Sequence, residues 1–314
     1  MKRDKFMSHI KRIQQHYEFY DDGCAKDAPV ILMLPGVSCG AALWRESIPY
    51  FLPGFKLLMF NNPGLNGTSL PLILSVEHIV GLVKQILDHL NITKCHIVGH
   101  SMGGYTAQRF ALMYPDMVDK IVLTSTSYGG PHIQKYAGDF AEEGFARAFG
   151  TNRKAILENP ENEYKLVFSE NYIKENPLDY KIIAHHLADI SSDVSTTVRH
   201  FACGSLFSSY GEIHTLDKDV LVIHGQDDKL IRPDGGELLA GQIKNAHILR
   251  LKNCGHMPMY EYENYYPRII DFLNGSEVGE LAPNDEPAKP MSHFDHTMKT
   301  YALGFERLLK MKFK

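Results

Sequence analysis

The sequence has few of the features that mark membrane, secreted or nucleic-acid-binding proteins. Its 314 residues include no apolar run of about 18 residues, the usual minimum for a membrane-spanning helix. Residues 1–9 are basic but lack the apolar stretch of a secretory signal. The net charge is only −4, which gives no reason to expect a nucleic-acid partner. We therefore expect a globular protein, and a cytoplasmic location is the simplest interpretation.

Cysteine is also scarce. The five cysteines are widely spaced, odd in number and include no C-x-x-C pair, which favours a reduced intracellular protein. The sequence contains no internal repeat and no low-complexity tract. With 44% hydrophobic residues, the chain suffices for one large α/β domain with an insertion or for two smaller domains.

Short apolar stretches alternate with segments of helical periodicity. Residues 30–34 are apolar throughout and end at Pro35-Gly36, which is typical of a strand buried on both faces of a parallel sheet. From Ser75 to Leu90, apolar residues recur at helical spacing. The same patterns predict further strands at residues 17–20, 55–60, 95–98, 120–125, 219–224 and 246–251. The alternation predicts an α/β fold with a doubly wound, mostly parallel sheet, formed by residues 17–127 and 217–274.

Residues 128–216 interrupt this alternation. They are polar and helix-prone and contain no clear strand. A segment of this length is too long for a plain loop. We predict an inserted helical lid over the carboxyl edge of the sheet, where open α/β sheets bind their ligands.

Both ends of the chain are basic. Residues 1–16 form a basic N-terminal extension whose apolar residues are spaced for one face of a helix: Phe6, Ile10 and Ile13. Residues 275–290 are acidic and contain prolines, as linkers do. Residues 291–314 predict an amphipathic, basic C-terminal helix. One hypothesis is that this helix docks on its own domain or forms a homo-oligomer. The other is that the basic ends make weak, peripheral contact with an anionic membrane surface.

The pentapeptide Gly-His-Ser-Met-Gly at residues 99–103 matches the pattern G-x-S-x-G. An apolar, β-branched stretch precedes it, and a helical pattern that ends before Pro115 follows it. A serine on such a sharp turn between strand and helix has an exposed hydroxyl at the helix N-terminus. Ser101 is therefore a candidate nucleophile. A glycine-rich turn without a catalytic function is the alternative.

A serine hydroxyl needs an adjacent base, and the base needs a carboxylate that orients it. Asp228 follows the strand that is expected to end at His224, and its neighbour Asp227 is a rival for the same function. His256 follows a glycine directly after the last predicted strand. Residues at the carboxyl ends of neighbouring parallel strands lie at one edge of a sheet, so His256 can reach the serine from a separate loop.

We interpret the other conspicuous histidines as structural. His100 precedes the serine and should point away from its hydroxyl, and His96 and His224 lie in predicted strands. His185 and His186 are adjacent but have no carboxylate or cysteine at the spacing of metal ligands. We therefore assign them to a lid helix rather than to a metal site.

With Ser101, Asp228 and His256 in this order, the chain resembles the α/β-hydrolase fold superfamily, in its serine-nucleophile branch with a helical lid. The resemblance rests on residues 34–37 (LPGV), 63–69 (PGLNGTS), 99–104 (GHSMGG), 222–228 (VIHGQDD) and 255–258 (GHMP). It implies that Ser101 is the nucleophile, His256 the general base and acid, and Asp228 the residue that orients His256. It also implies that the backbone N–H groups of Val37 and Met102 form the oxyanion hole, without a cofactor or metal.

Two loops depart from the pattern of the superfamily. The usual His-Gly of the first loop is Pro35-Gly36 here, which leaves the backbone donor in place. In the next loop, Asn66 stands where glycine is frequent, and Asn61 or Asn62 stands where an aspartate is usual. Asparagine tolerates a left-handed backbone better than most residues, so we expect the turn at Asn66 to persist.

The resemblance implies a serine hydrolase that cleaves a carboxylic ester or thioester through an acyl-enzyme on Ser101. Hydrolysis of a carbon–carbon bond or an amide by the same residues is an alternative. A ligand-binding receptor or scaffold with little turnover is an alternative from a different class of proteins. The expected partner is a small-molecule ester or acyl substrate, whose identity the sequence does not specify.

Overall fold

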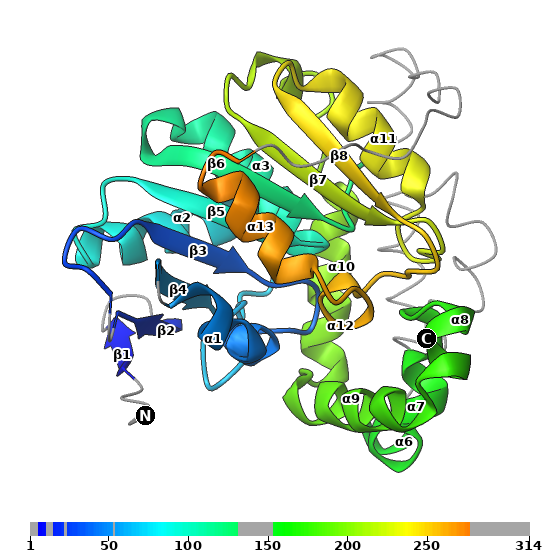
Figure 1. Ribbon diagram of the computed structural model, residues 1–314. Coiled ribbons are helices and arrows are strands. Elements are labelled where there is room, and N and C mark those ends of the chain that lie inside the picture. Colours follow the sequence, from blue (N-terminus) through cyan, green and yellow to red (C-terminus); the bar gives the residue numbers. More distant parts are fainter. Residues whose placement is uncertain (1–5, 11–14, 22–23, 53, 131–152, 277–314) are drawn as a thin grey trace.

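The computed structural model describes residues 6–10, 15–21, 24–52, 54–130 and 153–276 (Figure 1). Among these residues, one sheet is formed by β1 (Phe6–Ile10), β2 (Gln15–Tyr20), β3 (Val30–Leu34), β4 (Lys56–Phe60), β5 (Cys95–His100), β6 (Val118–Thr124), β7 (Val220–Gly225) and β8 (Ala246–Leu251). The strand order is β1-β2-β4-β3-β5-β6-β7-β8. β3 to β8 pair in parallel, whereas β1 and β2 extend one edge in antiparallel pairing. The predicted α/β fold with a mostly parallel sheet is confirmed.

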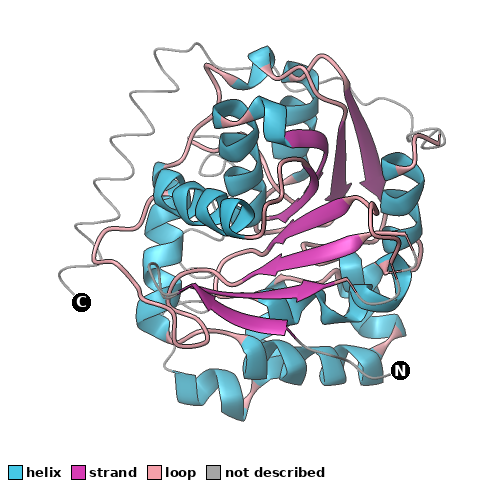
Figure 2. Ribbon diagram, turned by 90° about the vertical axis from the view of Figure 1, so that its left-hand side faces the viewer, coloured by secondary structure: helices cyan, strands magenta, loops and turns pink. Residues whose placement is uncertain are grey.

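The central strands are buried on both faces of the sheet because their side chains alternate between two apolar cores. In β3, Ile31 and Met33 belong to one core, and Leu32 and Leu34 belong to the other. All five residues of β3 are buried, as its uninterrupted apolar sequence predicts. Figure 2 shows the twist of the strands from one edge of the sheet to the other.

Helices cover both faces of the sheet. One face is covered by α2 (Val76–His89), α3 (Met102–Met113) and α11 (Pro233–Gln242). The other face is covered by the 3₁₀ helix η1 (Ala41–Ser47), α1 (Ile48–Phe51) and α13 (Tyr265–Leu273). Figure 1 shows α13 in front of the sheet, with α2 and α3 behind it. This doubly wound arrangement brings the loops after β3, β5, β7 and β8 to one edge of the sheet.

The chain between β6 and β7 forms a helical insertion. Its described part contains α6 (Arg153–Glu158), α7 (Pro160–Glu163), η4 (Tyr164–Leu166), α8 (Glu170–Glu175), α9 (Pro177–Ile190), α10 (Val194–Leu206) and η5 (Ile213–Thr215). An isolated bridge between Gly129 and Ser208 joins the two ends of the insertion. Figure 1 shows these helices, in green, grouped on the side toward which the arrow of β3 points. The predicted helical insertion is present, and its action as a lid stays a prediction.

The N-terminal segment differs from the prediction. Residues 6–10 form strand β1, not the predicted helix, and β1 pairs with β2 from Phe6 opposite Phe19 to Ile10 opposite Gln15. Three apolar residues at helical spacing are weak evidence, whereas an unpaired edge strand offers a row of backbone partners. β2 also begins at Gln15, two positions before the predicted start of the core.

Most of the predicted linker and all of the predicted C-terminal helix lie outside the described residues, which end at residue 276. These two segments and their hypothetical partners therefore stay predictions. No helix in the described part of the chain has the length and apolar character needed to cross a membrane.

Candidate active site

Ser101 lies on the turn between β5 and α3, as the pentapeptide predicts. Its backbone is strained, with φ of 55° and ψ of −120°, a region that costs a non-glycine residue about 1–3 kcal/mol. The Ser101 N–H donates to the carbonyl oxygen of Thr124 on β6 at 2.9 Å. The flanking glycines are required by close packing. A Cβ atom on Gly99 would lie 2.6 Å from the Gly103 oxygen, and one on Gly103 would lie 2.1 Å from the Leu34 oxygen.

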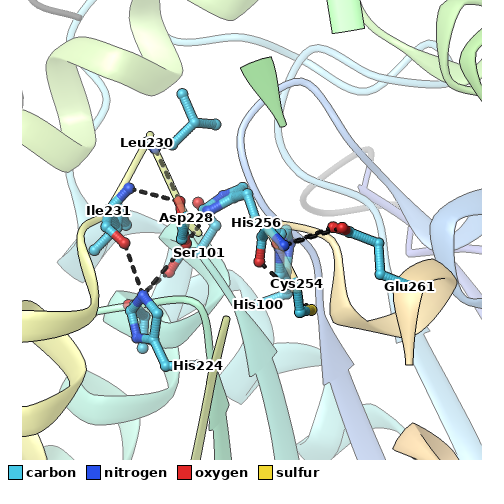
Figure 3. A network of polar contacts seen from close by, with 11 residues as sticks. His100, Ser101, His224, Asp228, Leu230, Ile231, Cys254, His256 and Glu261 are labelled. Atoms are coloured by element: carbon cyan, nitrogen blue, oxygen red, sulfur yellow. Dashed lines mark hydrogen bonds and ion pairs between the residues drawn. The ribbon is translucent and has the colours of Figure 1, made fainter. Parts of the chain in front are cut away.

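Asp228 is buried in the turn after β7, with all its carboxylate oxygens engaged. Oδ1 accepts hydrogen bonds from the N–H groups of Leu230 at 2.8 Å and Ile231 at 3.0 Å. Oδ2 accepts a hydrogen bond from Nδ1 of His256 at 2.8 Å (Figure 3). Burial by itself would raise the pKa of Asp228, but the attraction of His256 and the hydrogen bonds outweigh it, so this pKa is lowered below its ordinary value. The rival Asp227 is exposed.

His256 is buried in the loop between β8 and α12 (Pro258–Glu261). Because the Asp228 carboxylate can only accept, Nδ1 of His256 carries a proton and Nε2 is left as the basic nitrogen. The backbone of His256 is held on both sides. Its N–H donates to the carbonyl oxygen of Val167 at 2.9 Å, and its own carbonyl oxygen accepts from Nε2 of His100 at 2.9 Å. Figure 3 shows Ser101, Asp228 and His256 brought together from three separate loops.

The side chain of His100 points toward His256. The two imidazole rings have their centroids 4.9 Å apart. Burial, together with the nearby His256, lowers the pKa of His100 to about 3. His100 therefore stays neutral and donates from Nε2, so it supports the backbone of His256.

The loop after β3 also lies close to Ser101. A Cβ atom on Gly36 would lie 3.1 Å from Cβ of Ser101. Among the described residues, the N–H of Val37 has no hydrogen-bond partner in this loop or elsewhere. Met102 is the first residue of α3, so its N–H has no partner within the helix. Both N–H groups are thus available for the predicted oxyanion hole.

Asparagines from the neighbouring loop hold this segment in place. Nδ2 of Asn62 donates to the carbonyl oxygens of Pro35, Gly36 and Cys39 at 3.2, 2.9 and 3.1 Å. Asn61 accepts from the N–H of Ala41 at 2.8 Å. Asn66 adopts the left-handed backbone expected of it, with φ of 50°. The departures from the pattern of the superfamily therefore keep these loops ordered, through side-chain hydrogen bonds.

Comparison with known proteins identifies the family. The sequence profile of the alpha/beta hydrolase fold family matches residues 29–262. The chain belongs to the α/β hydrolase fold family. A relative from Cupriavidus pinatubonensis, named 2-hydroxy-6-oxononadienedioate/2-hydroxy-6-oxononatrienedioate hydrolase, is 30% identical over 84% of this chain and 93% of its own length. A relative from Dechloromonas aromatica with the same enzyme name is 27% identical over 83% of this chain and 91% of its own length.

Solved structures agree on the fold. A meta-cleavage product hydrolase from Pseudomonas fluorescens matches with a TM-score of 0.66 and 24% identity, covering 83% of this chain and 95% of that protein. The enol-lactonase from Burkholderia xenovorans matches with a TM-score of 0.69 and 19% identity, covering 86% of this chain and 100% of that protein. Identities this low show the fold alone. The family match and the curated relatives support the conclusion that this α/β hydrolase is a hydrolytic enzyme.

His224 was interpreted from the sequence as a structural residue, and its contact with Asp228 was not predicted. In this α/β hydrolase, Nε2 of the buried His224 lies 2.7 Å from the carbonyl oxygen of Ile231 and 3.3 Å from Oδ2 of Asp228. Both partners are acceptors, so this nitrogen is protonated. The spacing of four residues between His224 and Asp228 in the motif at 222–228 is the signal that could have suggested the contact.

Glu261 is a second supporting residue whose contacts were not predicted from the sequence. Its carboxylate accepts from the N–H of Gly255 at 3.0 Å and from the N–H of Ser169 at 2.9 Å. Burial raises the pKa of Glu261, and these backbone hydrogen bonds oppose the rise. Glu261 therefore joins the loop that carries His256 to the helical insertion. No feature of the sequence marks this contact, because Ser169 and Gly255 are far apart in the chain.

Within the described residues, no three His, Cys, Asp or Glu side chains lie together in a way that could hold a metal ion. His185 and His186 lie on α9, the helix of the insertion to which the sequence analysis assigned them. His185 lies 3.7 Å from the carboxylate of Glu161.

Proposed function

We propose that this α/β hydrolase cleaves a carbon–carbon bond next to a ketone carbonyl, through an acyl-enzyme formed on Ser101. The observation that carries the proposal is the hydrogen bond of 2.8 Å between Asp228 and His256, beside the strained turn at Ser101. The choice of bond is supported by the two curated relatives, which are named as hydrolases of 2-hydroxy-6-oxononadienedioate and 2-hydroxy-6-oxononatrienedioate.

In the first half of the reaction, the Ser101 oxygen attacks the ketone carbon while Nε2 of His256 takes the hydroxyl proton. Asp228 stabilises the resulting imidazolium. The carbonyl oxygen becomes an oxyanion, which accepts from the N–H groups of Val37 and Met102. Donors of this kind are typically worth about 2.7–4 kcal/mol each in the transition state.

Collapse of this intermediate breaks the carbon–carbon bond, and His256 returns its proton to the departing carbon. The departing carbon must hold the bonding electron pair until it is protonated, so the substrate needs a conjugated group that delocalises this pair. In the second half, His256 removes a proton from water, and the hydroxide attacks the acyl-enzyme. A carboxylic acid is released and Ser101 recovers its proton.

Ester or thioester cleavage, which the sequence analysis favoured, is the second candidate. Ester and thioester cleavage would begin with the same attack of Ser101 on a carbonyl carbon. Only the departing atom differs, and an oxygen or sulfur atom needs no conjugated group in order to leave. The names of the curated relatives favour the carbon–carbon bond. The remaining candidate, a receptor with little turnover, requires a ligand that binds without reacting at Ser101.

Turnover of three substrate classes tests the proposal: a 2-hydroxy-6-oxo dienoate followed by its ultraviolet absorbance, short-chain p-nitrophenyl esters, and acyl thioesters. We expect the highest kcat/KM for the dienoate. Ser101→Ala should lower kcat by about 10⁴-fold or more, whereas Ser276→Ala, at an exposed position, should leave it unchanged. Wild-type protein should also be labelled at Ser101 by a fluorophosphonate.

Higher kcat/KM for esters or thioesters than for the dienoate would overturn the choice of bond and leave the acyl-enzyme intact. Absence of fluorophosphonate labelling at Ser101 in folded protein would overturn the acyl-enzyme itself. If the dienoate binds tightly without turnover, and binds equally tightly to Ser101→Ala, the protein is a ligand-binding receptor instead of an enzyme.

A further inference from the structure

His200 joins three segments that are distant in the sequence. It lies on α10 of the helical insertion and is fully buried. Its Nδ1 accepts from the N–H of Ser38 at 3.1 Å, in the loop after β3. Its Nε2 lies 2.8 Å from the carbonyl oxygen of Pro63, in the loop after β4. Because a backbone N–H only donates and a carbonyl only accepts, these contacts specify one neutral tautomer, with the proton on Nε2. Burial agrees, since it lowers the pKa of His200 to about 4.

Ser38 is held by the same insertion through its side chain. Its backbone has φ of 63°, an uncommon conformation for a serine. Its hydroxyl lies 2.7 Å from the hydroxyl of Ser192 and 2.9 Å from that of Thr197, and it accepts from the N–H of Ser192 at 2.9 Å. The insertion thus contacts both the backbone and the side chain of the residue that follows Val37.

These contacts restrain Val37 from both sides. The Val37 N–H shares its peptide plane with the carbonyl oxygen of Gly36, to which Nδ2 of Asn62 donates at 2.9 Å. The next peptide plane contains the N–H of Ser38, which donates to His200. The Gly36 oxygen also accepts from the N–H of Cys39 at 3.3 Å. Val37 lies between these two planes, so hydrogen bonds on both sides restrain its φ and ψ and with them the direction of its N–H relative to Ser101.

We propose that His200 is a positioning residue for the oxyanion hole, acting through Ser38 to aim the Val37 N–H at the reacting carbonyl oxygen. The inference rests on the proposed function, because Val37 matters only if Ser101 forms an acyl-enzyme. It assigns the helical insertion a part in the chemical step, in addition to any covering of the substrate. Loss of the Nδ1 acceptor releases one of the two restrained planes, so the transition state loses stabilisation while the ground state of the substrate is bound as before.

A pair of amide variants separates the two nitrogens of His200. In His200→Asn, the amide oxygen stands close to the former position of Nδ1 and still accepts from Ser38. In His200→Gln, the amide nitrogen reaches the former position of Nε2 and still donates to Pro63, but nothing accepts from Ser38. Each variant keeps one of the two hydrogen bonds, so both should unfold at similar temperatures.

We expect His200→Gln to lower kcat by about 10–100-fold, less than the loss of a whole oxyanion donor, with KM within about threefold of wild type. His200→Asn should restore kcat to within about threefold, since it restores the acceptor. His247→Gln, at an exposed position on β8, is the matched control and should match wild type. The assay uses the best substrate of the panel and wild-type, Ser101→Ala and His200 variants of the full chain.

Equal kcat for wild type and His200→Gln would overturn the inference. The inference would also be overturned if both amide variants lost the same amount of kcat and their unfolding temperatures fell in proportion. His200 would then have only a structural function. These results are distinct from failure of the proposed function, in which wild-type protein is not labelled at Ser101 and Ser101→Ala retains its activity.

Discussion

Replacing Asp228 by asparagine should stop catalysis by changing the tautomer of His256. Oδ1 of Asp228 accepts from the N–H groups of Leu230 and Ile231, whereas Oδ2 accepts from Nδ1 of His256. An asparagine satisfies the two backbone donors only with its amide oxygen, which directs its NH₂ group toward His256. Nδ1 of His256 must then accept and the ring proton moves to Nε2, so the nitrogen that should take the Ser101 proton is already protonated.

A change of carboxylate to amide at this position of a Ser-His-Asp triad lowers kcat by about 10⁴-fold, or about 5.4 kcal/mol in the barrier. The asparagine NH₂ would also face the protonated Nε2 of His224, 3.3 Å from the present Oδ2. This contact between two donors should lower the free energy of unfolding by about 1–3 kcal/mol. The variant should therefore stay folded in circular dichroism while losing its activity.

Asp227→Asn is the matched control, because it makes the same change at the adjacent, exposed carboxylate. We expect its kcat to stay within about twofold of wild type, as for most exposed substitutions. The measurement is kcat on the best substrate of the panel, with the rate of fluorophosphonate labelling at Ser101 as a second readout. The reasoning is refuted if Asp228→Asn keeps kcat within tenfold of wild type, or if Asp227→Asn loses more activity than Asp228→Asn does.

Two further predictions concern stability. The pKa values of His100 and His200 are about 3 and about 4 in the folded protein, against an ordinary 6.5, because burial keeps both neutral. The unfolded chain therefore binds more protons below pH 6.5, and the free energy of unfolding should fall by about 4 kcal/mol between pH 7 and pH 5 from these two groups. Urea titrations at pH 7 and pH 5 should show about half of this loss in His200→Gln. An equal loss in wild type and His200→Gln would contradict the assignment of half of the pH dependence to His200. In the second prediction, Gly103→Ala should cost about 3 kcal/mol or more, because its Cβ would lie 2.1 Å from the Leu34 oxygen. Gly81→Ala, in α2 with no atom within 4 Å of the new Cβ, should gain about 1 kcal/mol. Chemical denaturation of both glycine variants measures this difference, and similar midpoints would refute the packing argument.

The parallel strands could be predicted from sequence because their signal is local. The apolar run at residues 30–34 has no polar residue to present to solvent, so it has to be buried on both faces. The start of α2 could also be predicted from the sequence, because Ser75 stands directly before the helix. Its hydroxyl accepts from the N–H of His78. β1 could not be predicted in this way. Its pairing depends on the free edge of β2, and the residues themselves carry only a weak helical pattern.

The sequence by itself determined the strand–turn–helix at Ser101, the helical insertion and the short list of residues that could act with the serine. These follow from local chemistry: glycine spacing, apolar periodicity and residue types that can transfer a proton. The resemblance favoured Asp228 over Asp227, but only the tertiary structure shows that Asp228 is buried against His256, because this contact depends on how the loops after β7 and β8 meet. The supporting contacts of Glu261 and His200 are of the same kind. Each joins backbone groups from segments far apart in the chain, and such proximity arises only when the sheet edge and the insertion have folded together.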